Sequence, residues 1–69
     1  MYIGTDVYGR AMYLENVGNH VRCTHIKEQR AVSINDIEVS SDIIRMFRNP
    51  QISGAYIYEE IRRRYGKRL

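Results

Sequence analysis

Apolar and polar residues alternate with a period of two over the first part of the chain. Met12 and Leu14 share one face of a strand, and Val21 and Cys23 share one face of the next strand. This period is typical of strands with one buried face. The sequence VGN around Gly18 lies between the two segments and contains residues that tolerate positive φ. The pattern therefore predicts a β-hairpin.

The alternation continues after a second polar turn, KEQR. Val32 and Ile34 share a face of a third strand, and the opening segment MYIGTDVY is predicted to add an edge strand. The segment NDIEV is expected to form either a short helical turn or a closing strand. In both cases Ile37 and Val39 would lie under the sheet. These features predict an antiparallel meander.

The period becomes helical after residue 40. In a helix predicted over 41–49, Ile43 and Phe47 face one side, whereas Arg45 and Arg48 face the other. The dipeptide NP ends this helix, because the residue before a proline is disfavoured in helical geometry. The first helix therefore has an apolar face and an arginine-bearing face.

A second helix is predicted over residues 53–66. Ile57, Ile61 and Tyr65 are spaced at four and form one apolar stripe, and Gly66 is placed to end the helix in a left-handed conformation. With the first helix it has the length and mid-turn glycine of a helix-turn-helix. Its outward face would present the repelling Glu59 to DNA, so a structural helical hairpin covering the sheet is favoured.

The order of strands and turns over residues 5–40 resembles the small SH3-like barrels of the Tudor and KOW type. The prediction is a single α+β domain over residues 1–69. In it a small SH3-like antiparallel β-barrel or curled β-meander, residues 1–40, precedes two C-terminal helices. Tudor domains that read methylated side chains use an aromatic cage. Residues 14–46 contain no aromatic side chain, so that activity is not expected.

Chain length and cysteine content indicate where the protein is located and whether it forms oligomers. The chain has 69 residues and one cysteine, which cannot form an intramolecular disulfide, so a reducing and cytoplasmic location is expected. No stretch approaches the roughly 18 apolar residues of a membrane-spanning helix, and no membrane partner is expected. A domain this small buries only about 60% of its unfolded surface, and pairing into a homodimer is one way to bury more.

Candidate catalytic and metal-binding residues are few. Cys23 and His25 point to one side of a strand and His20 points to the other, so the three do not converge on a metal ion. A cysteine–histidine catalytic pair would also need a third, orienting group. No glycine-rich phosphate loop or nucleotide fingerprint is present. We therefore expect a non-enzymatic protein with no metal and no cofactor, a buried thiol and histidines near the rim of the sheet.

Charge is distributed unevenly along the chain. Residues 1–42 carry a net charge of −2 and residues 43–69 carry +5. In the second helix Glu59 precedes Arg63 by four residues and Glu60 precedes Arg64 by four, a favourable spacing for ion pairs. The candidate binding residues are the other basic residues of 43–69 and two tyrosines that can stack on bases. They are Arg45, Arg48, Arg62, Lys67, Arg68, Tyr56 and Tyr65.

Two functions fit this pattern. The first is a small nucleic-acid-associated protein, whose Arg-rich helical face contacts the phosphates of DNA or RNA. The second is a regulatory protein that binds an acidic surface of a larger protein, since arginine and tyrosine are enriched at interfaces and exposed sheet edges invite strand addition.

Overall fold

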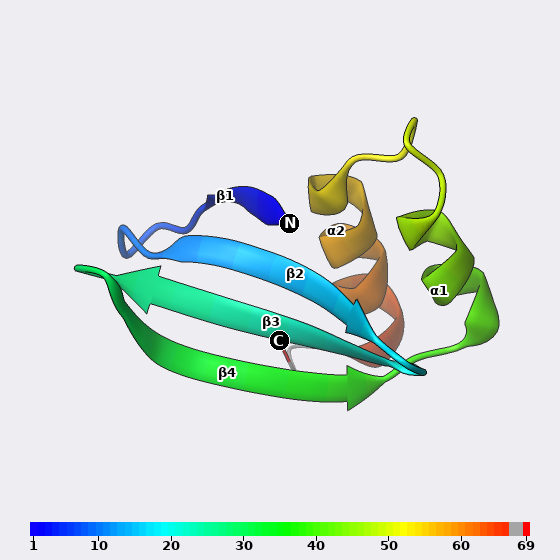
Figure 1. The fold of residues 1–69 in the computed structure, drawn as a ribbon, viewed down its shortest axis with the longest axis horizontal. Helices are drawn as coiled ribbons and strands as arrows, with labels where there is room; N and C mark the ends of the chain where they lie inside the picture. The colour runs from blue at the N-terminus through cyan, green and yellow to red at the C-terminus, as the bar shows by residue number, and fades with distance from the viewer. Residues whose placement is uncertain (67–68) are drawn as a thin grey trace.

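The computed structural model describes residues 1–66 and Leu69, and shows an antiparallel sheet followed by two helices. The α+β prediction is confirmed, and both helices lie on the same side of the curled sheet (Figure 1). In chain order the elements are β1 (Tyr2–Thr5), β2 (Ala11–Val17), β3 (His20–Lys27), β4 (Arg30–Glu38), α1 (Ser41–Phe47) and α2 (Gly54–Tyr65).

The sheet is an open meander. Its strand order is β1-β2-β3-β4, and each described strand pairs only with its neighbours in sequence. β1 and β4 are the two edges, so the closed SH3-like barrel is not confirmed, whereas the meander is. The physical reason is that the helices, and not a curled-back strand, cover the concave face of the sheet (Figure 1).

The core lies between that concave face and the helices. The inward positions predicted from the alternation are confirmed for Leu14, Val21 and Cys23, which are fully buried. Ile57 and Ile61 of α2 are also fully buried, as their spacing predicted. The remaining buried apolar residues are Ile37, Val39, Ile43 and Tyr58. Burial of these side chains supplies most of the driving force for folding.

The hairpin turns have left-handed backbones. Gly18 has φ of 63° in the β2–β3 turn, as expected for glycine. The β3–β4 turn instead consists of Glu28 and Gln29, with φ of 53° and 67°. Side chains with a Cβ are disfavoured in this region. The second turn is therefore formed at some conformational cost.

The segment NDIEV forms the closing strand and not the helical turn, because β4 continues to Glu38. Val32 and Ile34 share a face, as predicted, but this is the exposed outer face of the sheet. Their outward position follows from the register, in which Ile34 pairs with Thr24 on the side opposite buried Cys23. The sheet thus has one face covered by helices and one uncovered face.

The helix boundaries follow local signals. Ser53 precedes α2, and its hydroxyl accepts a hydrogen bond from the backbone N–H of Tyr56 at 3.1 Å. Gly66 ends α2 at the predicted position with a positive φ of 77°, but its ψ of −157° lies outside the left-handed helical region that was predicted. Within the described part of the chain, neither helix is long and apolar enough to cross a membrane.

Candidate functional site

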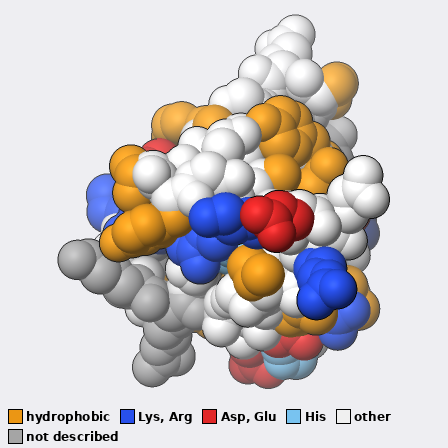
Figure 2. Space-filling model, turned by 90° about the vertical axis from the view of Figure 1, so that its left-hand side faces the viewer, with side chains coloured by type: hydrophobic (Ala, Val, Ile, Leu, Met, Phe, Trp, Pro, Cys, Tyr) orange, Lys and Arg blue, Asp and Glu red, His pale blue; other side chains and the backbone are white. Residues whose placement is uncertain are grey.

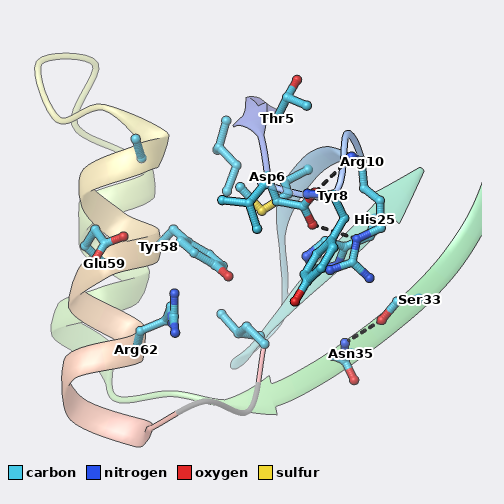
Figure 3. A pocket seen from close by; sticks show the side chains of 15 residues that line it. Thr5, Asp6, Tyr8, Arg10, His25, Ser33, Asn35, Tyr58, Glu59 and Arg62 are labelled. Atoms are coloured by element: carbon cyan, nitrogen blue, oxygen red, sulfur yellow. Dashed lines mark hydrogen bonds and ion pairs between the residues drawn. The ribbon is translucent and has the colours of Figure 1, made fainter. Parts of the chain in front are cut away.

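A cleft of about 620 Å³ lies between α2 and the half of the sheet that the helices leave uncovered. The helices lie over one end of the sheet, while the β1–β2 loop and the β3–β4 turn extend beyond them at the other (Figure 1). Three groups of residues line the cleft with polar atoms (Figure 3). They are Tyr58, Glu59 and Arg62 from α2; Thr5, Asp6, Tyr8 and Arg10 from the end of β1 and the β1–β2 loop; and His25, Ser33 and Asn35 from β3 and β4.

Two β-bulges shape the strands around this cleft. In β1 the register shifts between Tyr2 and Gly4, and Ile3, which lines the cleft, is the extra residue. In β4 the register shifts beside His25, and Val32 is the extra residue. Bulges bend a strand and redirect its side chains.

Asp6 holds the β1–β2 loop in one conformation. Its carboxylate accepts hydrogen bonds from the backbone N–H groups of Tyr8 and Arg10, both at 2.9 Å, and from the guanidinium of Arg10 at 2.6 Å. Although burial acts to raise the pKa of Asp6, the hydrogen bonds from Arg10 and Tyr8 hold it below its ordinary value. The guanidinium of Arg10 lies 5.2 Å from the centre of the Tyr8 ring. The loop thus presents an arginine and an aromatic ring together.

Arg62 and Tyr58 form the opposite wall. The guanidinium of Arg62 lies 5.7 Å from the centre of the Tyr58 ring, a favourable cation–π distance. Both side chains extend from α2 toward the side where Tyr8 and His25 lie (Figure 3). Burial raises the pKa of Tyr58, against the opposing effect of Arg62, so the phenol is neutral at physiological pH. No carboxylate among the described residues forms an ion pair with Arg62.

The neighbouring arginines of α2 are paired, although not entirely as predicted. Arg63 binds Glu60 at 2.6 Å rather than the expected Glu59. The expected pair of Arg64 with Glu60 is present at 3.5 Å, and Arg64 also binds Asp42 of α1. The charges of Arg63 and Arg64 are therefore offset within the fold.

His25 lies on the floor of the cleft. Only 5% of its surface is exposed, and its Nδ1 atom has no hydrogen-bond partner among the described residues. Burial lowers the pKa of His25, and Arg10 lowers it further, while Asp6 acts in the opposite direction. The ring is therefore neutral at physiological pH. Beside it, the amide of Asn35 donates to the hydroxyl of Ser33 at 2.9 Å.

Figure 2 looks directly onto the uncovered end of the molecule. Basic side chains lie beside an acidic one near the centre of this view, with hydrophobic side chains around them. The lining of the cleft is also mixed: two arginines and two carboxylates occur there together with Met12, Val7 and the rings of Tyr8 and Tyr58. Such a surface suits a ligand that has both flat apolar faces and charged or polar edges.

The arginines predicted to share one binding face are separated in the structure. Arg62 lines the cleft, whereas Arg45 and Arg48 lie around a second hollow beside Gly18 and Asn19 of the β2–β3 turn. Two further candidates, Lys67 and Arg68, lie outside the described residues.

The two candidate tyrosines differ in exposure. Tyr56 is exposed on α2 and lines neither the cleft nor the second hollow. The hydroxyl of Tyr65 accepts a hydrogen bond from the backbone N–H of Ser40 at 2.9 Å, and its half-buried ring packs against the core. Tyr65 therefore connects α2 to the start of α1.

The loop and strand residues of the cleft are not among the binding residues predicted from the sequence. His25 was predicted to lie near the rim of the sheet, but it is buried. It shares a face with Cys23, and His20 lies on the opposite face, as predicted. A usable signal was available. Continuing the inward period from Val21 and Cys23 places a polar residue, His25, at a core-facing position, and buried polar groups are unusual without a partner.

Comparisons of the chain with protein-family models, with curated proteins and with solved structures found no match. The function is therefore inferred from the residues of the cleft.

Proposed function

We propose that the protein is a non-enzymatic, nucleic-acid-associated binding protein whose cleft takes a segment of single-stranded nucleic acid. The observation that carries the proposal is the placement of Arg62 against the Tyr58 ring, across the cleft from Tyr8 and Arg10. Proteins that bind single strands combine a basic groove for the backbone with aromatic side chains on which bases stack. Arginines and tyrosine rings lie on opposing walls here, together with the carboxylates of Asp6 and Glu59.

Arg62 is the phosphate-binding group of this proposal. Glu60 and Asp42 form ion pairs with the next two arginines of the helix, Arg63 and Arg64. No described carboxylate forms an ion pair with Arg62 itself. The Tyr58 ring limits the orientations that its side chain can adopt. A planar, oriented guanidinium can donate two parallel hydrogen bonds to a phosphate.

Tyr8 is the stacking group of this proposal. Its ring is 70% exposed at the mouth of the cleft, and Arg10 lies against it. Stacking of a base on an aromatic side chain contributes about 1–3 kcal/mol and requires no particular base. In this proposal Arg62 binds a phosphate of the strand, and Tyr8 stacks on a neighbouring base.

Arg45 and Arg48 offer further phosphate contacts to a longer strand. They surround the second hollow, on a part of the surface that does not belong to the cleft. Lys67 and Arg68 stay candidates on the basis of their charge in the sequence. A strand that reached beyond the cleft would gain affinity from such contacts, mainly at low salt.

The test is fluorescence anisotropy of labelled single strands, with a duplex for comparison, from about 50 mM salt upward. Arg62→Gln should weaken binding by about ten- to a hundredfold, because a hydrogen bond to a charged group contributes roughly 1.5–3 kcal/mol. It should also reduce the slope of log K against log salt by about 0.7.

Arg63→Gln is the matched control. It removes the same charge from the adjacent position of the same helix, but from an arginine that is paired with Glu60. The affinity of this variant for single strands should stay close to that of the unaltered protein. Absence of binding at about 50 mM salt, where phosphate-driven affinity is strong, or equal losses in the two variants, would overturn the proposal.

A second candidate function is a regulatory protein that binds a larger protein. The observation that favours it is the uncovered outer face of the sheet, where apolar side chains are exposed: Tyr2, Tyr13, Val32 and Ile34. The rings of Tyr2 and Tyr13 lie 5.5 Å apart. In pull-down experiments, a protein partner retained after nuclease treatment and lost in Ile34→Glu would favour this function over nucleic-acid binding.

A further inference from the structure

We infer that the inner end of the cleft is a base-recognition pocket, in which one unstacked base of the bound strand hydrogen-bonds to His25, Ser33 and Asn35. This inference rests on the proposed function and adds base preference to it. The phosphate and stacking contacts described above lie on the two walls of the cleft, whereas these three side chains lie on its floor.

His25 is the first observation. It is more than nine-tenths buried, lines the cleft, and its Nδ1 atom has no hydrogen-bond partner among the described residues. A buried polar atom without a partner is destabilising, and native proteins contain few of them. The Nδ1 atom is itself covered by protein atoms, so a base would contact the part of the imidazole that lines the cleft.

Ser33 and Asn35 supply adjacent hydrogen-bonding groups. The Asn35 amide donates to the Ser33 hydroxyl oxygen, which leaves the Ser33 O–H to donate and the Asn35 carbonyl oxygen to accept. Ser33 is the direct cross-strand partner of His25, and Asn35 follows two residues later on the same face. A neighbouring donor and acceptor are what the polar edge of a base requires.

The charges around His25 keep its ring suited to this role. Arg10 and Asp6 face it from the β1–β2 loop, and Arg62 and Glu59 line the same cleft from α2. Because the ring is buried next to Arg10, it is neutral at physiological pH and offers one donor and one acceptor. A cationic ring would offer donors only.

The size and walls of the pocket also fit a base. The cleft volume of about 620 Å³ falls within the range of small-molecule sites. The ring of Tyr58 is only 9% exposed and forms an apolar wall next to the floor, with Met12 and Ile3 nearby. A base has apolar faces and a polar edge, so its faces would meet these walls and its edge would meet the floor.

The experiment compares affinities for short homopolymers of A, C, T and U at one salt concentration. The unaltered protein should prefer one base by roughly tenfold or more, because mismatched edges leave buried polar groups unpaired. His25→Phe and Asn35→Leu should each reduce that preference several-fold. The salt dependence should stay unchanged, since the phosphate contacts are intact.

His20→Phe is the matched control. It makes the same replacement on the same strand, but on the exposed outer face of the sheet. It should keep the full base preference, and urea unfolding should show that the other variants remain folded. Equal affinities for all homopolymers, or an undiminished preference in both His25→Phe and Asn35→Leu, would overturn the base pocket while leaving strand binding in place. Failure of every strand to bind would instead overturn the proposed function.

Discussion

Gly54 of α2 lies directly against Ile3 of β1 and Met1, and replacing it with alanine should destabilise the protein. An added Cβ would lie 2.5 Å from Cγ2 of Ile3 and 2.6 Å from Sδ of Met1. Ordinary contacts between carbon atoms are about 3.5–4.0 Å. The two neighbouring side chains would therefore have to move by about 1 Å.

The expected loss follows from two opposing contributions. Added volume in a packed region typically costs about 1–3 kcal/mol. Alanine recovers at most about 1 kcal/mol of helix propensity, and less here, since Gly54 is the first residue of α2. The free energy of unfolding should fall by about 1–2 kcal/mol. For a domain with an m-value of about 1 kcal/mol/M in urea, the midpoint should drop by about 1–2 M.

A double-mutant cycle with Ile3→Ala tests the cause of this loss. Ile3→Ala removes the Cγ2 atom, so Gly54→Ala should cost at least about 0.5 kcal/mol less in that background. Gly18 is a control, because a Cβ there meets no atom within 4 Å and the cost of Gly18→Ala comes only from its φ of 63°. An equal cost of Gly54→Ala in both backgrounds, or a stabilised Gly54→Ala, would refute the steric reasoning.

Two further predictions concern stability. Gln29→Gly should stabilise the protein by up to about 1 kcal/mol in urea unfolding, because Gln29 has φ of 67° and glycine adopts this conformation without strain; a destabilised variant would contradict this. The pKa of Asp42 is lowered from 3.8 to about 2 by hydrogen bonds from Ser40 and Arg64. Since the folded pKa is the lower one, this stabilisation is complete above about pH 4 and is lost as the pH falls toward 2. The unfolding free energies of the unaltered protein and Asp42→Asn should therefore converge on acidification, and a constant difference would contradict the pKa shift.

Much of the fold could be predicted because its signals are local. The inward positions of Leu14 and Val21 follow from alternation, and the stripe of Ile57 and Ile61 follows from helical spacing. The face occupied by Ile34 could not be predicted in the same way. Alternation shows which apolar residues of a strand lie on the same face of the sheet. Only the pairing register decides whether the helices cover that face.

The candidate site was predicted less completely. Arg62 was selected because the sequence offered it no pairing partner, and it does line the cleft. Arg45 and Arg48 carry the same sequence signal but lie around another hollow. Charge in the sequence identifies candidate residues. It does not fix their relative positions, which depend on how α1 packs against α2.

The sequence by itself determined the order of strands and helices, the position of both hairpin turns, and most of the core, because periodicity and turn preferences act over a few residues. Only the tertiary structure decided that the sheet stays open and extends beyond the helices. That difference in length creates the cleft, places Arg62 opposite Tyr8, and buries His25 on the floor. Local alternation does put His25 on the inner face with Cys23, but the cleft and the position of Arg62 opposite Tyr8 join residues that are distant in sequence, so no local pattern could specify them.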